Sequence, residues 1–110
     1  MRLPKAARLS LRREFVAVQE RGEKLHAGAY VVLGLPNGLG RARLGVTVST
    51  RVGGAVVRNR VKRWVREAFR VAARELPPMD VVVIARKGAP GAGPAGAQRA
   101  VAAARAVVLP

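Results

Sequence analysis

The sequence contains no cysteine among its 110 residues. Disulfide bonds and thiolate metal sites are therefore excluded, which fits a cytoplasmic protein. No apolar run approaches the length of about 20 residues that spans a bilayer. Charged residues also interrupt the opening segment, MRLPKAARLSLRREF, so the sequence predicts neither a secretory signal nor a membrane partner.

Acidic residues are scarce. Six Asp and Glu residues stand against 21 Lys and Arg, which gives a net charge of +15 and an isoelectric point of about 12.0. A domain this basic attracts polyanions, of which nucleic acid is the commonest in the cytoplasm. Arginine outnumbers lysine, and the planar guanidinium suits bidentate contact with phosphate.

The few acids give no sign of catalysis by the chain itself. They are spread singly along the sequence, and Asp80 is expected to act as a cap or to face solvent. The lone histidine, His26, falls in a predicted polar connection. Because no acid–base couple or cluster of metal ligands is apparent, we predict no catalytic residue and no metal site.

Aromatic residues are equally few: Phe15, Tyr30, Trp64 and Phe69. Proteins that read single-stranded RNA mainly by stacking need more aromatic platforms than this. Recognition of the phosphate backbone and of shape is the better expectation.

Periodicity predicts one small α+β domain over residues 1–110, with element order α-β-β-α-β-α and helices packed on a small sheet. Residues 1–9 are expected to form an extended basic lead-in, and residues 88–97, GAPGAGPAGA, a Gly/Pro/Ala linker. Ser10 is the expected N-cap of the first helix. A strand–turn–strand hairpin is expected over residues 29–50. The predicted helices cover residues 11–21, 55–75 and 97–108, and the predicted strands cover residues 29–35, 43–50 and 80–85.

The helix predicted from residue 55 is amphipathic and strongly basic. At about 100° per residue, its apolar side chains gather on one face: Val57, Val61, Trp64, Val65, Ala68 and Ala72. Asn59, Lys62, Arg63, Arg66 and Arg70 lie on the opposite arc. A merely solvated face usually mixes charges of both signs, so this one predicts contact with phosphates, whereas Trp64 is expected in the core.

The segment TVSTRVGGAVVRNRVKRWVREAFR resembles the signature of the bacterial ribonuclease P protein subunit, from Val52 through Phe69. The likeness extends to the first helix, to residues 30–33 and to the strand DVVVIAR at residues 80–86. The family's fold implies the ribosomal protein S5 domain 2-like architecture, with a left-handed βαβ crossover around the basic helix, although right-handed crossovers are the rule.

The resemblance also implies a function. The family's protein joins a catalytic RNA, ribonuclease P RNA, and the holoenzyme hydrolyses precursor tRNA to generate the mature 5′ end. The chemistry resides in the RNA, which holds most of the Mg²⁺, so the protein alone would be inactive and no obligate protein partner is implied. Carried over by position, the residues that contact RNA are Arg51, Arg58, Asn59, Arg60, Lys62, Arg63, Arg66 and Arg70.

The resemblance further implies a cleft that binds the 5′ leader of precursor tRNA, lined by Phe15, Val31 and Leu33. Gln19 and Leu33 occupy positions that are often aromatic in the family, so stacking on a leader base would be weaker here. Three alternatives stay open: a ribosome-associated or other structural RNA-binding protein, a nonspecific architectural protein, and a self-sufficient ribonuclease.

Overall fold

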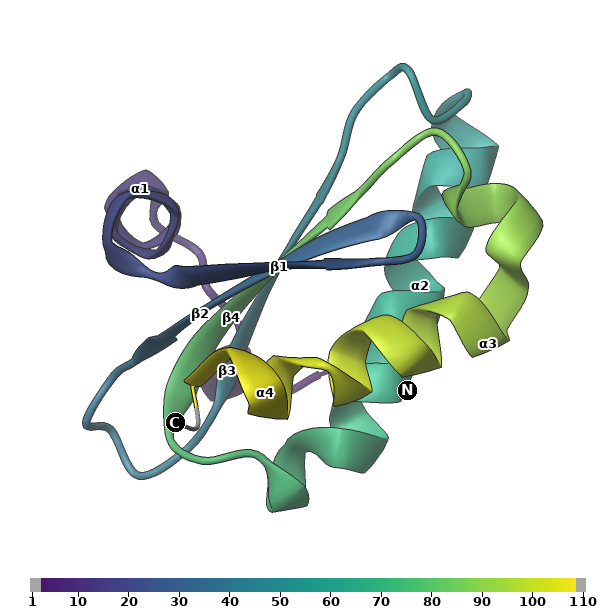
Figure 1. Ribbon diagram of the computed structural model, residues 1–110. Coiled ribbons are helices and arrows are strands. Elements are labelled where there is room, and N and C mark those ends of the chain that lie inside the picture. Colours follow the sequence, from purple (N-terminus) through teal and green to yellow (C-terminus); the bar gives the residue numbers. More distant parts are fainter. Residues whose placement is uncertain (1–2, 109–110) are drawn as a thin grey trace.

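The computed structural model describes residues 3–108 as a small α+β domain built on one mixed sheet of four strands (Figure 1). Its strands are β1 (Glu23–Ala27), β2 (Tyr30–Pro36), β3 (Arg43–Val48) and β4 (Met79–Ala85). Its helices are α1 (Arg12–Arg21), α2 (Ala55–Ala72), α3 (Ala89–Ala102) and α4 (Ala104–Val108), with short 3₁₀ turns η1 (Lys5–Ala7) and η2 (Ala73–Glu75). The predicted α+β class is confirmed.

The order of the strands in the sheet is β1-β2-β4-β3. β2 pairs antiparallel with both β1 and β4, whereas β3 pairs parallel with β4. The predicted hairpin over residues 29–50 is therefore wrong, because β4 lies between β2 and β3. β3, α2 and β4 form the βαβ unit whose left-handed course the resemblance implies.

Successive side chains along each strand point to opposite faces of the sheet, so the core is divided into two clusters, one on each face. On one face, α2, α3 and α4 cover the larger cluster, which includes Tyr30, Val32, Val81 and Val83. On the other face α1 covers a smaller cluster (Figure 1). Strand β3 follows this division, since Leu44 packs into the larger cluster and the next residue, Gly45, lies against the ring of Phe15.

Strand β1 was missed because its sequence, EKLHA, is polar and lies at an exposed edge. Only Leu25 and Ala27 of this strand pack against the larger cluster. His26, predicted in a connection, is on β1 and exposed.

The predicted linker at residues 88–97 is helical from Ala89. A kink at Gly93, where φ is 65°, is followed by Pro94. Gly96 and Ala97 are buried, and such small residues let α3 approach the neighbouring elements closely. Close packing within this segment is confined to the buried small residues Ala89, Gly96 and Ala97, and the expected last helix is divided between α3 and α4.

The predicted lead-in is packed against the domain rather than extended throughout. Leu3 and Leu9 are buried, residues 5–7 form η1, and the backbone N–H of Leu9 donates to the carbonyl of Leu44 at 2.9 Å. Residues 1–2 of this prediction lie outside the described part of the chain.

Candidate nucleic-acid interface

Helix α2 separates apolar from basic side chains as its sequence predicts. Val61, Val65 and Phe69 are fully buried, and Trp64 is half-buried against the same cluster. The other side of the helix carries the polar and basic residues that periodicity predicts there: Asn59, Arg63, Arg66 and Arg70 are exposed, and Lys62 is half-buried. The resemblance adds Arg60, which is exposed, and Arg58, which is half-buried. We call these seven residues the α2 basic face.

Arg58 differs from the rest of the α2 basic face. Its Nη1 donates to the backbone carbonyl of Gly53 at 3.0 Å, in the connection that precedes α2. The same connection carries Arg51, which is exposed. Arg58 therefore ties the connection to the first turns of α2.

The α2 basic face has little internal charge compensation. Within residues 3–108 its one ion pair joins Arg63 Nε to Glu67 Oε1 at 4.0 Å, between side chains that are 66% and 54% exposed. Such an exposed i,i+4 pair contributes only about 0.3–0.5 kcal/mol. The cations of this face are therefore available to an external polyanion.

The three residues expected in a leader cleft lie in one apolar cluster under α1. Val31 and Leu33 are buried, with 8% and 5% of their surface exposed, while Phe15 is half-buried. Phe15 also lines an open groove with Arg12, Gln19 and Thr47, which Val31 and Leu33 do not reach. A ligand on this side would therefore meet Phe15 first.

Gly45 explains how the ring of Phe15 comes so near the sheet. A Cβ atom at this position would lie 2.5 Å from Cε2 of Phe15, which is far inside contact distance. The absence of a side chain on β3 thus allows the phenyl ring of α1 to rest on the strand backbone.

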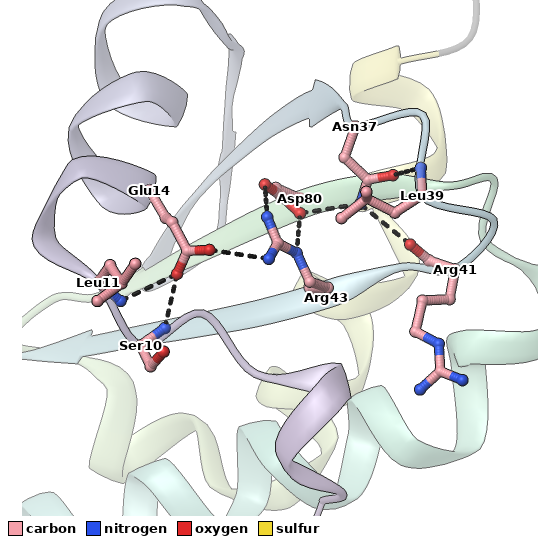
Figure 2. Close-up of polar contacts among 8 residues, drawn as sticks. All are labelled: Ser10, Leu11, Glu14, Asn37, Leu39, Arg41, Arg43 and Asp80. Carbon is pink, nitrogen blue, oxygen red and sulfur yellow. Dashed lines mark hydrogen bonds and ion pairs between the residues drawn. The ribbon is translucent and has the colours of Figure 1, made fainter.

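A polar network joins α1 to the sheet beside this cluster (Figure 2). The Arg43 guanidinium on β3 donates to Asp80 on β4, from Nε to Oδ1 at 2.8 Å and from Nη2 to Oδ2 at 2.7 Å. Its Nη1 donates to Glu14 Oε2 on α1 at 2.8 Å. Asn37 completes the network, since its Nδ2 donates to Asp80 Oδ1 at 2.9 Å.

Both carboxylates of this network correct the sequence prediction. Asp80 was expected to act as a cap or to face solvent, but it is buried and paired with Arg43. Ser10 was expected to cap α1, but Glu14 Oε1 accepts the backbone N–H groups of Ser10 and Leu11, each at 2.9 Å. Pairing of Arg43 with Asp80 requires β3 beside β4 in parallel register, and the sequence prediction did not specify which strand β4 would pair with.

The network also shifts pKa values. The backbone N–H groups of Leu11 and Ser10, and then Arg43, lower the pKa of Glu14. The hydrogen bond to Asp80 is the main cause that raises the pKa of Arg43. Glu14 and Arg43 therefore keep their charges at neutral pH, and charge-assisted hydrogen bonds hold α1 to β3 and β4.

Within residues 3–108, no three His, Cys, Asp or Glu side chains gather as ligands for a metal ion. In the same part of the chain, no helix is both long and apolar enough to cross a membrane.

Fold and surface together define a small α+β domain with a strongly basic exposed helix. The family model described as Ribonuclease P matches residues 3–106. The ribonuclease P protein component of Desulfovibrio desulfuricans is 48% identical over 91 residues, covering 79% of this chain and 69% of that protein. The ribonuclease P protein component of Thermotoga petrophila is 47% identical over 81 residues, covering 73% of this chain and 69% of that protein.

Solved structures of ribonuclease P proteins match the fold of this chain as well. The ribonuclease P protein of Staphylococcus aureus superposes with a TM-score of 0.82 at 31% identity, covering 91% of this chain and 93% of that one. The ribonuclease P protein of Thermotoga maritima superposes with a TM-score of 0.79 at 34% identity, covering 91% of this chain and 96% of that one. The chain therefore belongs to the ribonuclease P protein family, and this membership associates it with a tRNA-processing endonuclease and its RNA subunit.

Proposed function

We propose that this chain is the protein subunit of ribonuclease P and supports RNA-catalysed hydrolysis of precursor tRNA to the mature 5′ end. The observation that carries the proposal is the α2 basic face, which is exposed and has a single weak ion pair among the described residues. A family signature coincides with that face, and the family model spans residues 3–106.

In this proposal the α2 basic face and Arg51 bind the phosphates of the catalytic RNA. Arginine side chains suit this task because each guanidinium can make two parallel hydrogen bonds to one phosphate. The face supplies binding and orientation that are independent of base sequence.

The side of the sheet that α1 covers would receive the 5′ leader of precursor tRNA. Phe15 offers the accessible apolar contact, while Val31 and Leu33 support it from beneath as part of the same cluster. Arg12 lies in the same groove and supplies a positive charge for a leader phosphate.

The hydrolysis proceeds with Mg²⁺, which the catalytic RNA would hold. The described residues do not fit a magnesium site of their own, since their carboxylates do not gather into a ligand set. The proposal therefore assigns no metal-dependent step to this chain, and the protein is expected to be inactive alone.

The decisive experiment is cleavage of a precursor tRNA at low Mg²⁺ by a bacterial ribonuclease P RNA, with and without this protein. We expect cleavage only when both are present. Binding without enhanced cleavage would favour a structural RNA-binding protein, and cleavage by the protein alone would reveal a self-sufficient ribonuclease.

A further inference from the structure

A second basic surface lies beyond the end of α2, outside the residues assigned above except for Arg70. It is an open groove of about 740 Å³ between the N-terminal segment, residues 40–42 and the end of the α2–η2 helix. Its floor is apolar: Leu3, Ala42, Phe69 and Leu76 are all at least nine-tenths buried. We call it the α2-end groove.

The charged residues that line the α2-end groove are all arginines: Arg41, Arg70 and Arg74. All three are exposed, and none makes an ion pair within the described part of the chain. Figure 2 shows the side chain of Arg41 pointing away from the Arg43–Asp80 network, so those carboxylates do not neutralise it. Glu75 follows Arg74 in the chain but does not line the groove.

This arrangement of charges is unfavourable in the isolated protein. Arg70 and Arg74 are four residues apart on a continuous helical path, and like charges at this spacing repel. Arg41 adds a third positive charge from a different part of the chain. An anion in the groove would remove this repulsion and satisfy guanidinium donors from two sides.

The chemistry of the groove identifies its occupant. Three exposed guanidinium groups match successive phosphates of one strand, because each can make two charge-assisted hydrogen bonds to a phosphate. Phe69 is fully buried, so the groove has no exposed aromatic face for stacking, and binding would follow the backbone rather than the base sequence. Arg70 belongs to both surfaces, so one strand could continue from the α2 basic face into the groove.

We propose that the α2-end groove binds the phosphodiester backbone of an RNA strand through Arg41, Arg70 and Arg74. The inference rests on the proposed function for its partner, because the strand would belong to the RNA that the α2 basic face holds. It extends the RNA contact to the N-terminal segment and residues 40–42.

The first test compares binding to ribonuclease P RNA at several salt concentrations for wild type and R41A/R74A. Arg70 is left intact because it also belongs to the α2 basic face. R99A/R105A is the matched control, since it removes the same charge from exposed positions on α3 and α4. Circular dichroism and melting curves verify that each variant folds.

The groove variant should make the negative slope of log K against log salt shallower by roughly 1.4 to 1.8, corresponding to two lost phosphate contacts. The control should change the slope by less than half as much. Equal changes in the two variants would overturn the proposal, because net charge alone would then explain the loss.

A second test separates the groove from the proposed function. Side-chain Nε–Hε signals of arginine are followed by NMR while decauridylate is added to the wild-type protein. We expect the Arg41 and Arg74 signals to shift along with those of Arg60 and Arg63. If only the Arg60 and Arg63 signals shift, the proposal for the groove is rejected and the proposed function is not. If the Arg41 and Arg74 signals shift but the protein fails to enhance cleavage, only the proposed function is rejected.

Discussion

At the residue scale, Arg43 bonds two carboxylates that come from different elements. Asp80 lies beside it in the parallel β3–β4 register, and Glu14 reaches it from α1. The three side chains keep 19% or less of their surface exposed. At this burial a missing partner matters more than the pair itself, because an uncompensated charge would remain in a poorly solvated place.

We expect Arg43→Ala to lower the free energy of unfolding by about 3 kcal/mol. The variant leaves Asp80 buried without its cation and releases Glu14 from the sheet. Urea unfolding followed by circular dichroism measures the change. Arg41→Ala is the control, because that exposed side chain makes no ion pair in the described structure, and a loss within about 0.5 kcal/mol is expected. Equal losses in the two variants would contradict the network's role.

Glu14 predicts a dependence of stability on pH. The pKa of Glu14 in the folded protein lies below its ordinary value of 4.5, so its contribution to stability is fully present above the unfolded pKa and is lost as pH falls through the folded pKa. We expect Glu14→Gln to melt at a lower temperature than wild type at pH 7, and the difference to shrink below about pH 4.

The control for this series is Glu20→Gln, on the exposed side of the same helix. This variant should melt close to wild type at pH 7, because the Glu20 side chain is exposed and makes no hydrogen bond or ion pair in the described structure. A Glu14→Gln deficit that stayed constant down to pH 3 would disprove the assigned role of the carboxylate.

At the scale of elements, α2 separates its two roles by face. The apolar side anchors the helix over the sheet, and the opposite side is free for a ligand. Val61 is fully buried, whereas Val56 on the same helix is 73% exposed. The two valines therefore provide a matched pair with identical chemistry and different surroundings.

Val61→Ala should destabilise the fold by roughly 1–5 kcal/mol, because it removes buried methyl groups and leaves a cavity under the helix. Val56→Ala should change stability by less than about 0.5 kcal/mol. Chemical denaturation of both variants measures the contrast. If Val56→Ala proved as harmful as Val61→Ala, the orientation of α2 would be wrong.

Arg60→Ala and Arg63→Ala test the opposite face. Each should leave the unfolding curve nearly unchanged and reduce the salt slope of RNA binding by roughly one unit, because one phosphate contact is lost. Fluorescence titration with ribonuclease P RNA at several salt concentrations supplies the slope. Unfolding of either variant would show that the basic face has a structural role instead.

The sequence predicted α2 well because one strong 3.6-residue period runs through it, and Val61 and Val65 are buried as expected. It failed where local signals are weak or ambiguous. The edge strand β1 offers only Leu25 and Ala27 as inward-facing apolar residues, too few to signal a strand. The Gly/Pro/Ala segment before Ala97 is helical because packing at Ala89, Gly96 and Ala97 outweighs its weak helix propensity.

Among the polar residues, periodicity could place the α2 basic face but not the network around Arg43. A helix determines which of its own residues share a side, whereas the Arg43–Asp80 pair depends on which strands are neighbours. That neighbourhood follows from the crossover through α2, and no short-range pattern encodes it. Glu14 was missed for the same reason, since its partner lies 29 residues away in the chain.

At the scale of the whole molecule, charge is the dominant property. A net charge of +15 on 110 residues favours solubility but destabilises the compact state through self-repulsion. The ion pairs of the described residues involve Arg43 and Arg63 and leave most of the other cations uncompensated. Anions that bind the folded protein should therefore stabilise it.

We expect sulfate to raise the melting temperature, and to raise it more than sodium chloride at equal ionic strength. Chloride mainly screens the repulsion, whereas sulfate also occupies sites where several guanidinium groups converge, such as the α2-end groove. At a concentration of 100 times the dissociation constant, one such site would add about 2.7 kcal/mol. Scanning fluorimetry with Trp64 as the probe measures the shift. Identical curves in the two salts would mean that screening accounts for the whole effect, and a melting temperature that neither salt moves would mean that self-repulsion does not limit this fold.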